Sequence, residues 1–216
     1  MPLVFNRAID STTLLGLWKI EETTEVLKAL VELTPEEEAQ YESSKSEVRK
    51  KQWLSYRALL KTMLGQEIGS IQYDTFGKPY LKNGPLISIT HSGEYSAIIA
   101  SKTNQVGIDI EPLKDRIHRI TAKFLTPEED KSIGDINRTE KLYIAWGAKE
   151  ALYKLYGKPE VEFQRDIFIQ PFDYLCSGNG KCIAEMKTPE GAAKYDISYE
   201  KIAGNMLVYT IAEVAK

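Results

Sequence analysis

Hydrophobic and polar residues alternate along several short stretches of the chain, which is the two-residue period of β-strands. This pattern predicts strands at residues 3–9, 14–20, 68–73, 79–81, 86–90, 95–101 and 106–111. Apolar residues three and four apart predict helices at residues 35–64, with a break near Ser43 and Ser44, and at 117–124, 127–133 and 139–156. Residues 166–214 resemble an antiparallel meander with turns at 178–180, 189–191 and 203–205. Because strands and helices come in separate runs, the fold class predicted is α+β.

Two similar segments indicate an internal duplication. The motif Leu-Thr-Pro-Glu-Glu starts at Leu33 and again at Leu125, and each copy has the Thr, Pro and Glu spacing of a capping box at a helix start. Further along, aligning the two tryptophans Trp53 and Trp146 matches Arg57 with Glu150. We therefore expect two related halves, residues 1–105 and 106–216, packed as a pseudo-twofold dimer with an active-site cleft between them. An acid in one half and a cation in the other would suit a metal and an anionic ligand.

The composition is that of an ordinary soluble protein: 216 residues, 43% hydrophobic and 27% charged. The net charge of −3 gives no basic field for nucleic acid or a membrane surface. There is no signal-peptide pattern at the start, so we expect a cytoplasmic protein. Cys176 and Cys182 flank a predicted hairpin turn, and reduced thiols are expected in that compartment. The cysteines and two histidines lack zinc-site spacing, so any metal should be oxygen-bound.

The candidate chemistry lies in the strand at residues 106–111, of sequence VGIDIE. The strand period places Asp109 and Glu111 on one face, roughly 7 Å apart. In the helix at 139–156, Glu150 and Lys154 lie one turn apart on the same side. Three carboxylates and a lysine that meet at one point would suit a hard cation and a phosphate ester. Taken singly, the same residues would be the wet face of a strand and a surface ion pair.

Four motifs follow one another in the same order as in a known protein family: FGKPY at 76–80, ISITHSG at 87–93, VGIDIE at 106–111 and WGAKEALYK at 146–154. Together they resemble the 4'-phosphopantetheinyl transferase superfamily, most closely its larger, monomeric, surfactin-synthetase-activating type. The resemblance implies Mg²⁺-dependent transfer of the phosphopantetheine arm of coenzyme A to a serine hydroxyl of an apo acyl or peptidyl carrier protein. The implied by-product is adenosine 3',5'-bisphosphate, and the implied oligomeric state is a monomer.

The resemblance also implies roles for the acidic residues and the helix lysine. Asp109, Glu111 and Glu150 would be the Mg²⁺ ligands, and two neighbouring carboxylates suit a cation that neutralises their repulsion. Glu150 would be a metal ligand, the general base for the serine, or both. Lys154 would stabilise negative charge that builds on the phosphate oxygens. Asp109 and Lys154 would thereby also contact coenzyme A.

Four further residues are implied to bind coenzyme A. Lys78, in a Gly-Lys-Pro turn, would bind a phosphate, and His91 would bind the 3'-phosphate. Thr90 would add a hydroxyl or simply pack. Arg57 resembles an arginine that contacts the nucleotide phosphate, to which its fork of donors is suited. Without the resemblance, Lys78, His91 and Arg57 would each be interpreted as an ordinary structural or surface side chain.

Two basic clusters are candidates for ligand or carrier contacts. Residues 49–51, Arg-Lys-Lys, would help to hold the 3'-phosphate or meet an acidic carrier protein, unless they form a solvated face. Residues after Glu111 would form the carrier-docking rim: Lys114, Arg116, Ile117 and Arg119. Gly147 departs from the family, which commonly has Ser, Thr or Cys there, and a mid-helix glycine costs about 1 kcal/mol relative to alanine.

Two other functions fit parts of the pattern. A metal-dependent phosphoester hydrolase could use the same acids, but two-metal hydrolases usually need more Asp and His ligands than this chain offers. A non-catalytic module that binds coenzyme A or a carrier protein would be favoured by a missing acid, and all three acids are present. Magnesium-dependent mass gain on an apo carrier protein separates the transferase from both.

Overall fold

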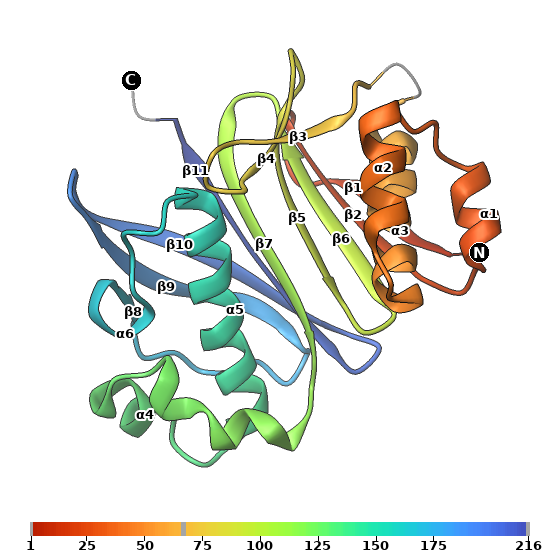
Figure 1. Cartoon of the computed structure of the whole chain (residues 1–216). Coiled ribbons are helices and arrows are strands. Elements are labelled where there is room, and N and C mark those ends of the chain that lie inside the picture. Colours follow the sequence, from red (N-terminus) through yellow and green to blue (C-terminus); the bar gives the residue numbers. More distant parts are fainter. Residues whose placement is uncertain (1, 66–67, 215–216) are drawn as a thin grey trace. The chain divides into compact units, whose positions relative to one another are not determined.

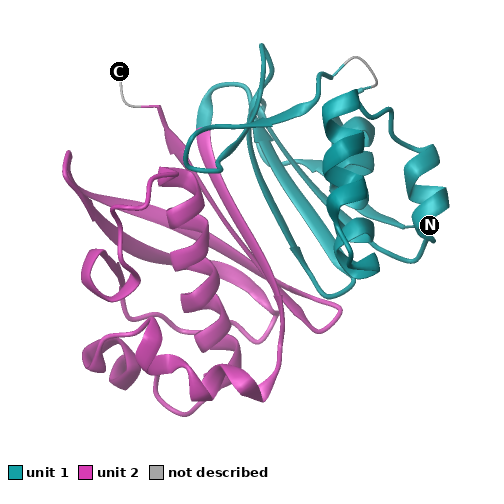
Figure 2. Ribbon diagram, in the orientation of Figure 1, with its two compact units in different colours: residues 1–104 teal, residues 105–216 magenta. Residues whose placement is uncertain are grey.

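The computed structural model describes residues 2–65 and 68–214 of the chain. The chain divides into two compact units, residues 1–104 and 105–216, each with its own hydrophobic core (Figure 2). Both units combine sheets and helices, so the fold is a mixed α and β architecture. Within the described ranges, none of the helices combines the length and apolar character that crossing a bilayer needs.

Unit 1 is built on a four-stranded sheet in the order β1-β2-β6-β5, covered by helix α3 (Figure 1). A small hairpin, β3–β4, lies outside this sheet. The elements are β1 (Leu3–Ala8), β2 (Thr13–Lys19), α1 (Thr24–Ala29), α2 (Pro35–Ser43), α3 (Glu47–Leu64), β3 (Ile71–Tyr73), β4 (Pro79–Leu81), β5 (Leu86–Ser92) and β6 (Tyr95–Ser101). The core lies between α3 and the sheet, since Leu54 and Leu59 of α3 and Ile98 of β6 are fully buried.

Unit 2 is built on a five-stranded sheet in the order β7-β11-β10-β9-β8, and α5 packs on β11 (Figure 1). Its elements are β7 (Asn104–Pro112), the 3₁₀ turns η1 (Asp115–Arg119) and η2 (Thr121–Lys123), α4 (Pro127–Ile133), α5 (Arg138–Tyr156), α6 (Phe163–Asp166), β8 (Ile167–Ile169), β9 (Asn179–Thr188), β10 (Gly191–Ile202) and β11 (Asn205–Glu213). The order β7-β11-β10 with α5 repeats the order β2-β6-β5 with α3 in unit 1. The two units therefore share a common substructure.

Both predicted capping boxes form. Thr34 and Thr126 each accept a hydrogen bond from the backbone N–H three residues on, and Glu37 and Glu129 each accept one from the threonine N–H. A buried cation on the long helix then pairs with each glutamate. In unit 1, Arg57 Nε lies 3.0 Å from Glu37 Oε1, and the corresponding contact in unit 2 joins Lys149 Nζ and Glu129 Oε2 at 2.8 Å.

These pairs correct the internal alignment by one residue. The structural equivalent of Arg57 is Lys149, not Glu150, because each pairs with the capping-box glutamate of its own unit. Aligning Trp53 with Trp146 places the two helix sequences one residue out of register. The buried ion pairs determine which side of each helix faces the core, so they are a better guide to equivalent positions than one shared residue type.

Two glycines that lie against the long helices support the corrected register. A Cβ on Gly16 would lie 3.0 Å from the Leu59 side chain and 2.4 Å from that of Met63. A Cβ on Gly107 would lie 1.9 Å from the carbonyl oxygen of Ala151 and 3.1 Å from Leu155 Cβ. Leu59 lies as many positions before Ala151 as Met63 lies before Leu155. Glu37 and Glu129 are separated by the same number of positions. In both units a glycine strand position lets the helix approach closely.

Most elements were predicted, with a few errors. The predicted helix at 117–124 is two 3₁₀ turns, and the short helices α1 and α6 were missed. The predicted tight turn between Cys176 and Cys182 is wrong: β8 and β9 do pair antiparallel, but a longer loop over residues 170–178 joins them, and Asn179 and Gly180 already belong to β9. Cys176 is exposed and Cys182 is buried, and both are free thiols. Residues 66–67, just before the strand predicted at 68–73, lie outside the described residues.

Gly147 allows α5 to pack closely on β11. A Cβ there would lie 2.7 Å from Val208 Cγ2 and 2.9 Å from Val208 Cβ, both of them side-chain atoms. At Gly107, by contrast, a Cβ would meet backbone, which cannot rotate away. Overpacking of this kind typically costs about 1–3 kcal/mol.

We expect Gly107→Ala to lower the free energy of unfolding of unit 2 by more than Gly147→Ala does, measured by urea titration of the full chain. Gly107→Ala should reach or exceed about 3 kcal/mol, whereas movement of Val208 should relieve part of the strain at Gly147. Equal losses for both variants would contradict the backbone contact as the cause.

Candidate active site

Strand β7 and helix α5 bring the predicted acids of unit 2 together. β7 is buried from Val106 to Ile110, so Asp109 is enclosed and only 5% exposed. This rules out the interpretation of Asp109 as part of a wet strand face. Glu111, two residues on, is half-buried. Strand alternation therefore places one deeply and one partly enclosed carboxylate along the same side of β7.

Lys154 joins helix α5 to this strand. Its Nζ donates to Asp109 Oδ1 at 2.7 Å and to the carbonyl oxygen of Ile108 at 3.0 Å. The ion pair it forms is thus with the strand aspartate, not with Glu150 one turn earlier as a surface pair would be. Because two acceptors on β7 hold it, the ammonium has a fixed position beside Asp109.

Glu150 is a carboxylate with a raised pKa. Burial is the main cause that raises its pKa to about 7, and the negative charges of Asp109 and Glu111 add to the rise. The charge of Lys154 acts in the opposite direction. The influence of both acids shows that the three carboxylates lie within electrostatic reach of one another.

The donor atoms here suit a hard cation, but the carboxylates do not form a complete cage. Across residues 2–65 and 68–214, no group of three or more His, Cys, Asp or Glu side chains could hold a metal ion. Asp109 and Glu111 offer the carboxylate oxygens that Mg²⁺ takes, and Mg²⁺ usually keeps waters and substrate phosphate oxygens as its other ligands. The residues therefore fit a magnesium ion held by one or two carboxylates.

A separate cavity of about 450 Å³ lies in unit 1 beside His91. Its lining combines aromatic rings with cations: Gln40, Tyr41, Ser44, Arg49, Lys50, Gln52, Trp53, Tyr56 and His91. The Tyr56 ring stacks on the imidazole of His91 with centroids 6.0 Å apart and planes 9° apart. A volume of this size is in the range of small-molecule sites, and its cations favour an anionic ligand.

The structure assigns different environments to the other predicted coenzyme residues. Thr90 is buried whereas His91 is exposed, so the two neighbours on β5 face opposite sides. Lys78 is half-buried in a tight turn, where its backbone N–H donates to Asp74 Oδ1 at 2.9 Å. Burial lowers the pKa of Lys78, opposed by the charge of Asp74. Arg57 lines a smaller cavity of unit 1, separate from that of His91.

Two predictions from the basic clusters have different outcomes. Arg49 and Lys50, but not Lys51, are among the residues that line the His91 cavity, and a ligand role for the cluster stays a prediction. Ile117 is wrong as a docking residue, because it is 2% exposed and belongs to the core of unit 2. Arg116 is exposed, and its Nη2 lies 3.6 Å from Glu111 Oε2.

Sequence reasoning missed the aromatic walls of the cavity, which Tyr41, Trp53 and Tyr56 form. The available signal was the one-turn spacing of Trp53 and Tyr56 directly after the Arg-Lys-Lys cluster. It also missed Lys149, whose fully buried ammonium is hydrogen-bonded three times.

Comparisons with known proteins agree with the motifs. Residues 105–179 match the family model described as the 4'-phosphopantetheinyl transferase superfamily. This match and the curated relatives described below support that superfamily for this chain. The match lies wholly in unit 2, which carries Asp109, Glu111 and Glu150.

Three curated relatives carry the corresponding name. A putative 4'-phosphopantetheinyl transferase of Synechocystis sp., slr0495, is 28% identical over 141 residues, which are 58% of this chain and 57% of the relative. HetI of Nostoc sp. is 29% identical over 47% of this chain and 48% of its own length. AcpT of Escherichia coli strain K12 is 32% identical over 50% of this chain and 59% of its own length. The chain thus spans about half the length of the curated relatives it matches.

Proposed function

We propose that this protein transfers the 4'-phosphopantetheine arm of coenzyme A to a serine hydroxyl of an apo acyl or peptidyl carrier protein. Adenosine 3',5'-bisphosphate is released. The observation that carries the proposal is the meeting of Asp109, Glu111 and Glu150 with Lys154 between β7 and α5. The four family motifs and the relatives' names support it. In this proposal the chain is of the larger, surfactin-synthetase-activating type, acting as a monomer in the cytoplasm.

The acids divide into two roles. Asp109 and Glu111 would hold Mg²⁺, which would supply positive charge to neutralise the phosphate groups of coenzyme A. Glu150 accepts the proton of the serine hydroxyl as it attacks the phosphorus next to the pantetheine arm. The base role is supported by the burial that raises the pKa of Glu150 to about 7. A role of Glu150 as a third Mg²⁺ ligand is part of the same proposal.

Lys154 stabilises the negative charge that builds on the phosphate oxygens and the leaving group. Asp109 Oδ1 and the Ile108 carbonyl hold its ammonium, so little rearrangement is needed at the moment of reaction. Coenzyme A is bound in unit 1: His91, Arg49 and Lys50 take the 3'-phosphate in the 450 Å³ cavity, and Lys78 takes a further phosphate. That the two units act together as related halves about a pseudo-twofold axis is part of the proposal.

The 3'-phosphate assignment predicts a change in preference between two coenzymes. We expect His91→Ala to raise the KM for coenzyme A by about 10- to 100-fold, because the variant loses one hydrogen bond to a charged phosphate. The variant should prefer coenzyme A over its analogue without the 3'-phosphate less strongly than the wild type does, with Arg49 and Lys50 supplying the preference that remains, measured as kcat/KM for each.

His118→Ala is the matched control, because His118 is an exposed histidine bonded to Thr139 in unit 2. It should keep the preference for coenzyme A. If His91→Ala also keeps the full preference, His91 does not bind the 3'-phosphate.

A further inference from the structure

One nitrogen of the buried Arg57 guanidinium has no hydrogen-bond acceptor among residues 2–65 and 68–214. The Arg57 side chain is 6% exposed; its Nε donates to Glu37 Oε1 at 3.0 Å and its Nη1 to the Trp53 carbonyl oxygen at 3.3 Å. Nη2 is buried, and no acceptor in those ranges pairs with it. Leaving a buried charged donor unsatisfied is costly, so a native protein normally supplies an acceptor from the chain, water or a ligand.

Unit 2 shows what occupies the equivalent position there. Lys149, the counterpart of Arg57, donates to Glu129 and also to the carbonyl oxygens of Phe163 and Ile167, at 2.9 and 2.7 Å. The segment from α6 to the start of β8 thus satisfies the buried cation of unit 2. In unit 1, Arg57 instead lines a cavity, together with residues 68–71.

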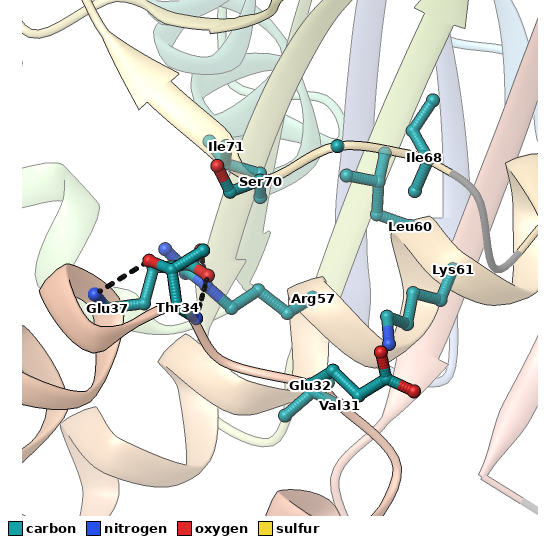
Figure 3. Close-up of a pocket in the computed structure, with 11 residues that line it drawn as sticks. Val31, Glu32, Thr34, Glu37, Arg57, Leu60, Lys61, Ile68, Ser70 and Ile71 are labelled. Atoms are coloured by element: carbon teal, nitrogen blue, oxygen red, sulfur yellow. Dashed lines mark hydrogen bonds and ion pairs between the residues drawn. The ribbon is translucent and has the colours of Figure 1, made fainter.

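The cavity beside Arg57 is small and carries a second cation and a hydroxyl (Figure 3). It measures about 70 Å³, several times the roughly 10–15 Å³ that one water needs on the same measure. Lys61 and Ser70 line it together with Arg57. Two carboxylates also line it: Glu37, which already accepts from Arg57 and Thr34, and the exposed Glu32.

We propose that Arg57, Lys61 and Ser70 bind a small tetrahedral oxyanion, inorganic phosphate or sulfate, in this cavity. The guanidinium supplies a charge-assisted donor and the hydroxyl a second donor, and Lys61, whose ammonium Figure 3 shows apart from the guanidinium, turns toward the bound anion by a change of rotamer. Since the Glu37 carboxylate is already occupied by Arg57 Nε, the second edge of the guanidinium remains for the anion. This site is separate from the coenzyme cavity beside His91, and it gives Arg57 an inorganic ligand in place of the nucleotide phosphate.

Isothermal titration of the full-length chain with inorganic phosphate at constant ionic strength tests the site. The His91→Ala background weakens phosphate binding in the proposed coenzyme cavity, where Arg49 and Lys50 remain, so the signal of the Arg57 cavity is the part that Lys61→Met and Ser70→Ala reduce. We expect saturable phosphate binding in that background, weakened at least tenfold by Lys61→Met and measurably by Ser70→Ala. Sulfate should compete with phosphate, and chloride should not.

Lys131→Met in the same background is the control, because Lys131 is a lysine of unit 2 in α4, far along the chain from this cavity. It should leave the phosphate affinity unchanged. A titration without binding, or with binding that neither Lys61→Met nor Ser70→Ala weakens, would mean that water alone fills the cavity. The readout needs neither coenzyme A nor a carrier protein, so it stands or fails apart from the transferase proposal.

Discussion

Replacement of Glu150 by glutamine should reduce transfer of phosphopantetheine by about 10²- to 10⁴-fold, the usual contribution of a general base. The amide keeps the size of the side chain but cannot accept the serine proton. Because the loss concerns proton transfer, we expect it mainly in kcat, with a smaller change in the KM for coenzyme A. Steady-state kinetics with an apo carrier protein measures both constants.

Glu140→Gln is the matched control on the same helix. Glu140 pairs with Lys201 at 3.0 Å near the surface of unit 2, and nothing assigns it to the chemistry. Its replacement should leave kcat within about twofold, since exposed ion pairs contribute about 1 kcal/mol or less. If Glu150→Gln keeps wild-type kcat, Glu150 is not the base and another group takes the proton.

Lys149→Met should be the most destabilising of the substitutions considered. The Lys149 ammonium is fully buried and bonded to Glu129 Oε2 and two backbone carbonyls. Its removal leaves a buried carboxylate without its partner, and breaking such a pair typically costs about 3–5 kcal/mol. We expect that loss in the free energy of unfolding of unit 2, measured by urea titration.

Lys201→Met provides the comparison, because the pair it breaks with Glu140 is largely exposed. The expected cost is at most about 1 kcal/mol. Lys149→Arg should recover part of the stability, since it restores the charge in a different shape. Equal losses for Lys149→Met and Lys201→Met would show that the buried pair is not a main support of unit 2.

Local signals predicted much of the fold. The Thr-Pro-Glu-Glu spacing set both capping boxes, because those bonds involve residues only three apart. The alternation around Asp109 predicted β7, and the helix containing Glu150 was placed to within a residue. Each of these elements is determined by neighbours in the sequence, which a single sequence displays.

The errors came from contacts between distant residues. The loop before β9 contains turn-type residues, yet Gly180 already pairs with Tyr199 of β10, so β9 begins earlier than predicted and a longer loop joins it to β8. Arg57 is drawn inward by Glu37, twenty residues earlier, which the helix pattern cannot reveal. Burial of Asp109 likewise depends on how α5 packs, since Lys154 covers it from another element.

The central claim is that this protein modifies a carrier protein with phosphopantetheine, and intact-protein mass spectrometry tests it most directly. Purified apo carrier proteins of fatty-acid, polyketide and peptide synthesis would each be incubated with the protein, coenzyme A and Mg²⁺. We predict a mass gain of one phosphopantetheine on at least one carrier, absent with EDTA and in Glu150→Gln. No gain on any of the three, or coenzyme A broken down without a carrier present, would contradict the account.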